Sequence, residues 1–167
     1  MRLLDQKFKK SWPSYILQCL LATLPIGGLL LIMDAALQTT LIAALGSSSF
    51  LAFAAPHSHA SRPRYLLSGY SIGTLIGCLF SLLAQHPYWG SSPELSHYAL
   101  LACSALAPGI AIFCMVITNT EHPPAAGLAL GYVLSDWNLA TIAIIFIGII
   151  AISMVKETLK MRMIDLV

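Results

Sequence analysis

Serine, histidine, glutamate and arginine residues at a few places in this sequence could bind or move small ions. Three consecutive serines, Ser47, Ser48 and Ser49, carry hydroxyl groups that can donate hydrogen bonds to an anion that has shed its water. Much later in the chain, Glu121 and His122 are neighbours, and both side chains can exchange protons. What these residues can do depends on whether the fold places them in water or in a membrane.

The composition answers that question. The 167 residues are 57% hydrophobic and 10% charged, whereas about 25% of the residues of a soluble domain are charged. Uncharged runs close to the roughly 20 residues that a membrane-spanning helix needs cover residues 11–33, 35–61, 65–93, 95–120 and 137–155. We therefore expect an all-α membrane protein, a single transmembrane domain over residues 1–167, with no soluble domain of appreciable size.

The charged residues predict how the chain crosses the membrane. Three basic clusters stand before the first run, in one loop and after the last run: Lys7, Lys9 and Lys10; Arg62 and Arg64; Lys156, Lys160 and Arg162. The positive-inside rule places all of them in the cytoplasm, which requires an even number of crossings between them. The loops left outside then contain Asp34, Glu94 and Asp136 but no Lys or Arg. We expect about six segments in the cell inner (plasma) membrane, with both termini cytoplasmic.

Two of the six segments look abnormal. The uncharged stretch from His122 to Ser135 covers roughly 21 Å as a helix, against a bilayer core of about 30 Å, so a helix that begins at Pro123 would start below the membrane surface. Gly46 and the three serines interrupt the second run, and a helix that begins at Ser47 would also start at depth. Three segments per half predict an inverted repeat, residues 11–84 and 95–155, as transporters commonly have.

Both recessed helix starts would face the membrane interior from opposite sides. Free N–H groups and the positive end of the helix dipole favour an anion there. The residues assigned to a substrate path on this basis are Gly46, Ser47, Ser48, Ser49, His122, Pro123, Pro124, Ala125 and Gly127. The alternative is that Gly and Ser are small contact residues that let helices approach closely, and that the prolines only fix a helix boundary.

Several of these segments resemble a known family. The segments Gly46-Ser-Ser-Ser-Phe-Leu-Ala-Phe-Ala-Ala-Pro56, Arg62-Pro-Arg64, Gly69-Tyr70 and Thr120-Glu-His-Pro-Pro-Ala-Ala-Gly127 occur in the order seen in the HPP family of integral membrane proteins, and the resemblance covers about residues 10–155. Members in cyanobacteria and plant plastids are similar to nitrite transporters, which implies passage of a small monovalent anion.

The chain departs from the family pattern at two places. Tyr70 follows Gly69 where the family usually has Gly-His, and the loop reads His57-Ser-His59-Ala-Ser rather than Ser-Pro-Leu-Ala-Gln. These departures put the identity of the anion in question, and Tyr70 becomes a candidate for gating or coupling.

Other polar residues have a functional and a structural interpretation. Glu121 would repel an anion, so it is either paired with a basic residue or protonated for coupling. Arg62 and Arg64 could concentrate anions at a cytoplasmic mouth or only fix topology. His57 and His59 lack a third metal ligand, so we expect no metal and no cofactor.

The sequence leaves several functions open. We expect a channel or transporter for a small inorganic anion, nitrite or nitrate, that works in the lipid bilayer as a homo-oligomer and binds no nucleic acid. The alternatives are a membrane scaffold or regulatory module that transports nothing and a cation or proton-coupled carrier that uses Glu121. An intramembrane enzyme would need Glu121, His122 and a serine to meet, and no spacing brings them together. We therefore expect no enzyme.

Overall fold

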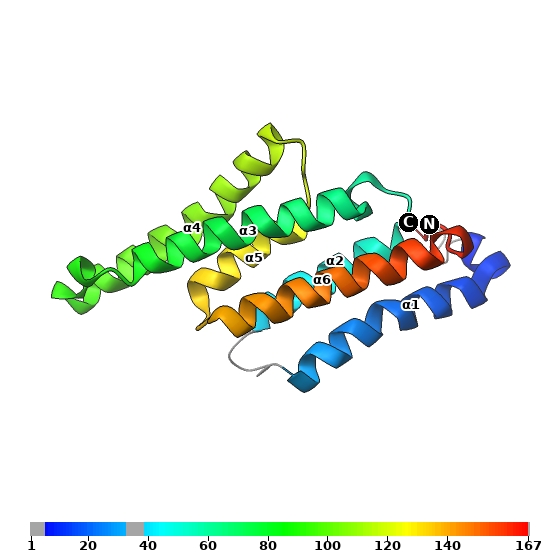
Figure 1. Cartoon of the computed structure of the whole chain (residues 1–167), viewed down its shortest axis with the longest axis horizontal. Helices are drawn as coiled ribbons and strands as arrows, with labels where there is room; N and C mark the ends of the chain where they lie inside the picture. Colours follow the sequence, from blue (N-terminus) through cyan, green and yellow to red (C-terminus); the bar gives the residue numbers. More distant parts are fainter. Residues whose placement is uncertain (1–5, 33–38, 167) are drawn as a thin grey trace.

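In the computed structural model, which describes residues 6–32 and 39–166, the chain is built from α-helices and short turns (Figure 1). The helices are α1 (Gln6–Ile32), α2 (Thr39–Ala54), α3 (Pro63–Ala84), α4 (Pro93–Ile117), α5 (Pro123–Leu134) and α6 (Leu139–Leu159). Three single-turn 3₁₀ segments connect or follow them: η1 (His59–Ser61), η2 (Pro87–Ser91) and η3 (Lys160–Arg162). The all-α membrane class is thus confirmed. Asp34 lies outside the described residues.

The helices differ in length as the sequence predicts. Among the described residues, three helices are long and apolar enough to cross a membrane: α3 with the turn after it, α4, and α6 with the turn after it. Helices α2 and α5 are apolar but shorter, with 16 and 12 residues. Along the chain, a long helix, a short helix and a long helix follow one another twice. Helix α2 contacts α1 and α6, and helix α5 contacts α4 and α3. The inverted repeat stays a prediction.

The start of α1, the end of α2 and the segment after α6 meet at one end of the molecule. The amide of Leu166 donates to the carbonyl of Ala54 over 2.8 Å. Gln18 of α1, which is buried, donates to the carbonyls of Phe53 and Ile164. Because α3 begins just after this end, all three basic clusters lie on the same side of the bundle (Figure 1), as six alternating segments require.

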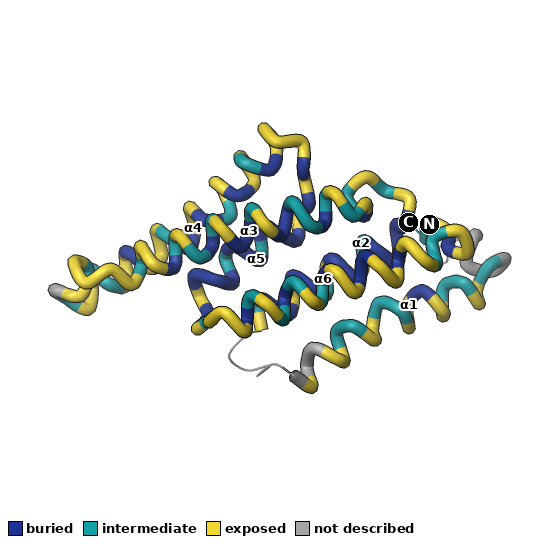
Figure 2. Tube along the Cα trace, viewed as in Figure 1, coloured by how far each residue is buried: buried dark blue, intermediate teal, exposed yellow. Residues whose placement is uncertain are grey.

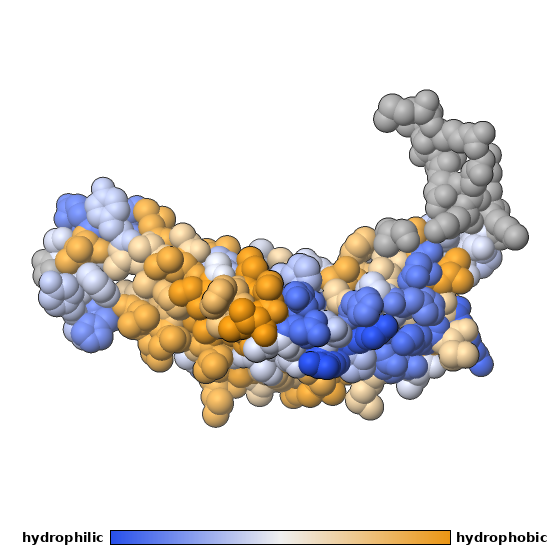
Figure 3. All heavy atoms as spheres, turned by 90° about the horizontal axis from the view of Figure 1, so that it is seen from above, coloured by the Kyte–Doolittle hydropathy of each residue, from blue (hydrophilic) through white to orange (hydrophobic). Residues whose placement is uncertain are grey.

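Apolar side chains cover much of the outer surface. Figure 3 shows a broad hydrophobic area left of the centre of this face, between hydrophilic side chains at the left end and a second hydrophilic patch that begins near the middle. Leu75, Phe113 and Ile147, one from each long apolar helix, are more than 60% exposed, as expected of residues that face lipid. Helix α5, by contrast, is almost entirely buried (Figure 2), so it forms the centre of the bundle.

The expected break at the serine block does not occur. Helix α2 runs without interruption from Thr39 to Ala54, through Gly46 and all three serines, so the prediction of a helix start at Ser47 is wrong. The hydroxyls of Ser47 and Ser48 bond back to the carbonyls of Ala43 and Ala44, over 3.0 and 3.1 Å. This bonding satisfies both hydroxyls inside the apolar bundle without a break in the helix.

Candidate functional site

The structure brings together one residue from each of three sequence motifs. Ser48 lies in α2, Tyr70 in α3 and His122 immediately before α5. The Ser48 Oγ lies 2.8 Å from the Tyr70 hydroxyl and 2.8 Å from His122 Nε2. All three residues are fully buried. A hydrogen-bonded chain of two hydroxyls and one imidazole therefore lies inside the largely apolar bundle.

Its partners determine how the imidazole is protonated. His122 Nδ1 lies 2.9 Å from the carbonyl oxygen of Ala60. Because a carbonyl can only accept, Nδ1 carries a hydrogen and Nε2 of the neutral ring accepts from Ser48. Tyr70 then donates to Ser48. The Ser48 Oγ also lies 3.1 Å from the carbonyl oxygen of Ala44. The hydroxyl can therefore rotate its single hydrogen from His122 Nε2 to that carbonyl without a change in the backbone.

Three glycines of α3 hold His122 in this position. Gly69, Gly73 and Gly77 are spaced four residues apart and face α5. A Cβ at Gly69 would lie 2.6 Å from the Cβ of His122, and one at Gly73 would overlap the carbonyl oxygen of Ala125. Small residues at this spacing let two helices approach to backbone contact. The close approach of α3 and α5 therefore aligns Tyr70 with His122.

The start of α5 lies where the sequence predicts, but its amides do not form an anion site. Pro123 and Pro124 occupy the first two helical positions and have no N–H. The amide of Ala125, next in line, donates to the carbonyl of His122 over 2.9 Å. The expectation that free N–H groups at this helix start bind an anion is therefore wrong. The start of α5 still carries the positive end of the helix dipole, but the polar groups beside it belong to side chains and not to the backbone.

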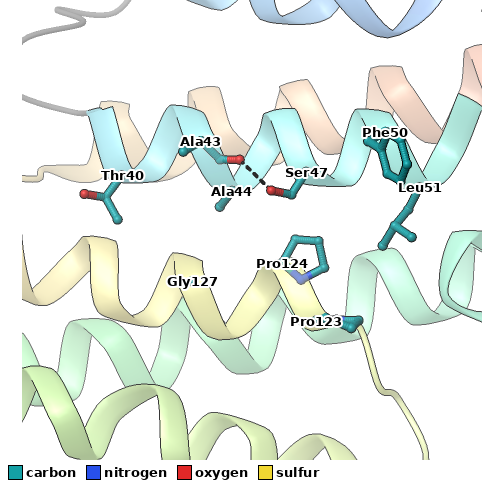
Figure 4. Close-up of a pocket in the computed structure, with 9 residues that line it drawn as sticks. All are labelled: Thr40, Ala43, Ala44, Ser47, Phe50, Leu51, Pro123, Pro124 and Gly127. Carbon is teal, nitrogen blue, oxygen red and sulfur yellow. Dashed lines mark hydrogen bonds between the residues drawn. The ribbon is translucent and has the colours of Figure 1, made fainter. Parts of the chain in front are cut away.

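A groove runs between the two short helices (Figure 4). Its volume is about 570 Å³, and α2 and α5 supply its walls. Four residues assigned to a substrate path from the sequence line it: Ser47, Pro123, Pro124 and Gly127. A smaller cavity of about 250 Å³ between α4 and α5 is lined by Glu121, His122 and Pro123, among others. Pro123 thus lines both cavities, and His122 of the buried cluster lines the smaller one.

The chain matches the family described as the HPP transmembrane region over residues 7–159. It belongs to the HPP family. A transmembrane protein of Dictyostelium discoideum is 31% identical over 98 residues, which cover 59% of this chain and 31% of that protein. The chain thus spans about a third of the length of the curated relative that it matches. No solved structure matches it.

The His-Pro-Pro sequence that gives the HPP family its name has a clear structural role here. A residue before proline favours an extended backbone, and His122 has φ −133° and ψ 95°. This conformation lets its ring reach the carbonyl of Ala60 in η1 while Pro123 starts α5. The HPP motif therefore links α5 to the loop between α2 and α3.

The remaining predicted residues lie apart from the cluster. Gly46 faces α1, with Ile26 3.5 Å from the position of a Cβ, and Ser49 is buried without a hydrogen-bond partner among the described residues, so both fit the packing interpretation. Arg62 and Arg64 are exposed at the start of α3. Glu121 is exposed and forms no ion pair within the described part of this one chain. Its pairing with a basic residue of a neighbouring subunit stays a prediction.

The two loop histidines have no shared role. His57 lies 3.3 Å from Asp165 of the segment after α6, and His59 packs edge-on against Tyr65. Among residues 6–32 and 39–166, no three His, Cys, Asp or Glu side chains are placed to hold a metal ion.

The sequence analysis missed several residues that build the site. Gly73 and Gly77 were detectable, because with Gly69 they repeat every fourth residue. Ala60, whose carbonyl orients His122, has no recognisable signal, since any residue supplies a carbonyl.

Proposed function

We propose that this chain transports a small inorganic anion, nitrite or nitrate, across a membrane along the groove between α2 and α5. The observation that carries the proposal is the buried cluster of Ser48, Tyr70 and His122 beside the start of α5, whose Ser48 follows the groove-lining Ser47 and whose His122 lines the smaller cavity. A polar cluster in an apolar membrane bundle is costly, and an ion path gives a reason for it. The family resemblance supports the choice of anion.

The cluster offers what a dehydrated anion needs. Hydroxyl groups rotate, so the O–H groups of Tyr70 and Ser48 can turn from each other toward an anion. A proton on His122 Nε2 would add a third donor and a positive charge, next to the positive end of the α5 dipole.

The groove itself favours an anion over a cation. Its lining contains no carboxylate, whereas Glu121 borders only the smaller cavity. An anion in the groove therefore meets Ser47 and the start of α5 without passing Glu121. A cation carrier would require the opposite arrangement, with carboxylates along the larger groove. Both termini in the cytoplasm, residence in the inner membrane and assembly into a homo-oligomer remain predictions.

The test uses two glycines that both have room for a side chain. A Cβ at Gly127, in the groove, or at Gly109, exposed on α4, would meet nothing within 4 Å. Purified protein in proteoliposomes should take up nitrite under a membrane potential. We expect Gly127→Phe to reduce the initial rate at least tenfold, because the ring fills the groove, and Gly109→Phe to leave it unchanged. Equal rates in all three proteins would contradict the path, and no uptake by the unmodified protein would contradict the function.

A serine hydrolase is the second candidate, because the structure does bring a serine and His122 together. The 2.8 Å contact between Ser48 Oγ and His122 Nε2 is suitable for a nucleophile and its base. Against it, Ser48 is fully buried in the middle of a helix. Labelling of Ser48 by a fluorophosphonate, lost in His122→Ala, would support the hydrolase. Absence of labelling in folded protein would leave the serine as part of a binding cluster, consistent with no enzymatic function.

A further inference from the structure

The carbonyl oxygen of Ala60 determines which nitrogen of His122 carries the hydrogen. It lies 2.9 Å from Nδ1 of His122, and a carbonyl can only accept. Nδ1 is therefore the protonated nitrogen of the neutral ring, and the lone pair of Nε2 faces Ser48. The loop between α2 and α3 (residues 55–62) supplies this carbonyl. A residue that fixes the loop therefore also fixes the state of the ring.

Ser61 fixes this loop from the inside. Its side chain is fully buried, and its Oγ lies 2.9 Å from the carbonyl oxygen of Pro56 and 2.9 Å from that of Ser58. Because a hydroxyl has a single hydrogen, the two carbonyls share it. The side chain thus ties the residue that follows Ala60 to the beginning of the loop.

Few main-chain bonds hold the same turn. The amide of Ser61 donates to the carbonyl of Ser58 over 3.3 Å, and the amide of Arg62 donates to the carbonyl of His59 over 3.1 Å. Within the described residues, the carbonyl of Pro56 accepts from Ser61 Oγ and from no main-chain amide. The Ser61 hydroxyl therefore closes a part of the loop that the backbone leaves open.

The two ends of the loop are held by other contacts. Near its start, the amide of His57 donates to Oδ1 of Asp165 over 3.1 Å. At its end, the carbonyl of Arg62 accepts from the amide of Leu66 in α3 over 3.1 Å. Removal of the Ser61 hydroxyl should therefore move the turn between these two points and leave the helices on either side in place.

We propose that Ser61 is a positioning residue that acts through the carbonyl of Ala60 and keeps the lone pair of His122 Nε2 directed at the buried cluster. A proton that reaches the ring then binds at Nε2, beside Ser48, and not at Nδ1, which faces the loop. This inference rests on the proposed transport function and deepens it. The positive charge on Nε2 attracts the anion to the place where the hydroxyls of Ser48 and Tyr70 can donate to it.

The loop contains a matched control for Ser61. Ser58 Oγ is buried and has no hydrogen-bond partner among the described residues, so Ser58→Ala removes a hydroxyl that holds no other group. Ser61→Ala removes the hydroxyl that closes the loop. Ser61→Cys keeps a side chain of similar size with a weak donor, and it gives the same information if Ser61→Ala does not fold.

The measurement is solid-state NMR of the protein in lipid bilayers, with ¹⁵N-labelled histidine, at about pH 8, where neutral imidazole dominates. Ring nitrogens with and without a hydrogen give well-separated signals, so the spectrum reports the ratio of the two neutral forms. The chain has five histidines, and the signals of His122 are those that disappear in His122→Ala.

We expect the unmodified protein and Ser58→Ala to carry the hydrogen of His122 on Nδ1. In Ser61→Ala and Ser61→Cys the carbonyl of Ala60 can move away, and the ring can release the Nδ1 proton to water and take one from water on Nε2, with no change of charge. The ratio of rings with Nε2–H to rings with Nδ1–H should rise at least about fivefold, the effect of one lost hydrogen bond. Nitrite uptake into proteoliposomes should slow in the same variants.

An unchanged ratio in the folded Ser61 variants would overturn the positioning role, as would an equal rise in Ser58→Ala, which indicates a general loosening of the loop. A hydrogen on Nε2 of His122 in the unmodified protein would overturn it as well. If the ratio changes while nitrite uptake does not, the positioning role stands and the part assigned to His122 in transport is wrong. If the unmodified protein takes up no nitrite, the transport function fails, and the NMR ratio still decides what Ser61 does.

Discussion

The two short helices, α2 and α5, differ in what fixes their ends. Helix α5 begins at Pro123, where two prolines and the extended His122 set the boundary, and it lies in backbone contact with the glycines of α3. Helix α2 passes through Gly46 and three serines without a break. Its last carbonyls, of Phe53 and Ala54, instead accept bonds from Gln18 and from the amide of Leu166.

This difference shows that small polar residues alone do not interrupt a helix. A serine hydroxyl can bond to the carbonyl one turn earlier, and one glycine costs only about 1 kcal/mol relative to alanine. Proline removes an N–H group and constrains the residue before it. Of the two helix starts expected from the sequence, only the one marked by prolines exists; its depth in the membrane stays a prediction.

The largest effect should come from the glycine contacts that hold α5. In Gly73→Ala the new methyl group would overlap the backbone oxygen of Ala125, which cannot move aside as a side chain could. We expect a loss of about 3 kcal/mol in the free energy of unfolding, measured as a lower thermal midpoint in fluorescence-detected size exclusion. Gly127→Ala, with open space at its Cβ, is the control and should gain up to about 1 kcal/mol. Equal midpoints would refute the close contact.

Ser48 tests whether α2 contributes to the site through one residue of its serine block. Ser48→Ala leaves the Tyr70 hydroxyl and His122 Nε2 without their shared partner, so we expect a loss of about 2 kcal/mol and slower nitrite uptake. Ser49→Ala removes a buried hydroxyl that has no partner among the described residues. It should be neutral or slightly stabilising. If the two variants behave alike, the cluster makes no special contribution.

Gln18 tests how the end of α2 is held. Gln18→Leu removes the bonds to the carbonyls of Phe53 and Ile164 while keeping a side chain of similar size. We expect a loss of about 1–2 kcal/mol and faster tryptic cleavage at Lys160 and Arg162, because the segment after α6 loses its anchor. Nitrite uptake should change less than in Ser48→Ala. Unchanged cleavage would show that the segment is held by other contacts, such as buried Met163.

The smallest effect should follow loss of the pair between His57 and Asp165. Both side chains are more than 40% exposed, and exposed pairs contribute little. Asp165→Asn should therefore change the free energy of unfolding by less than about 0.5 kcal/mol, and high salt should have an equally small effect on the unmodified protein. A fall in the thermal midpoint as large as that of Gln18→Leu would show that this contact, too, determines where α2 ends.

The sequence predicted the fold class and the order of the segments well, because both depend on local composition. Long uncharged runs indicate membrane helices wherever they occur, and the three basic clusters correctly placed the start of α1, the start of α3 and the end of α6 at one end of the bundle. The prolines after His122 correctly marked the start of α5. The break at Ser47 was wrong, because glycine and serine keep their N–H groups and cost a helix little, whereas proline removes the N–H.

The candidate site was predicted only in parts. Ser48, Tyr70 and His122 each stand in a motif that is recognisable in the sequence, but nothing in their spacing of 22 and 52 residues indicates that they touch. Their meeting requires α3 and α5 to lie in backbone contact, and this follows from glycines that act only when a partner helix is present.

The sequence by itself thus determined that this is an all-α membrane protein, where α5 begins and to which family the chain belongs. These properties depend on composition, charge and short motifs, each readable without neighbours in space. Only the tertiary structure decided that a serine from α2, a tyrosine from α3 and the histidine before α5 form one buried chain. Hydrogen bonds of 2.8 Å between distant segments depend on how closely helices approach, and that distance is set by packing across the whole bundle.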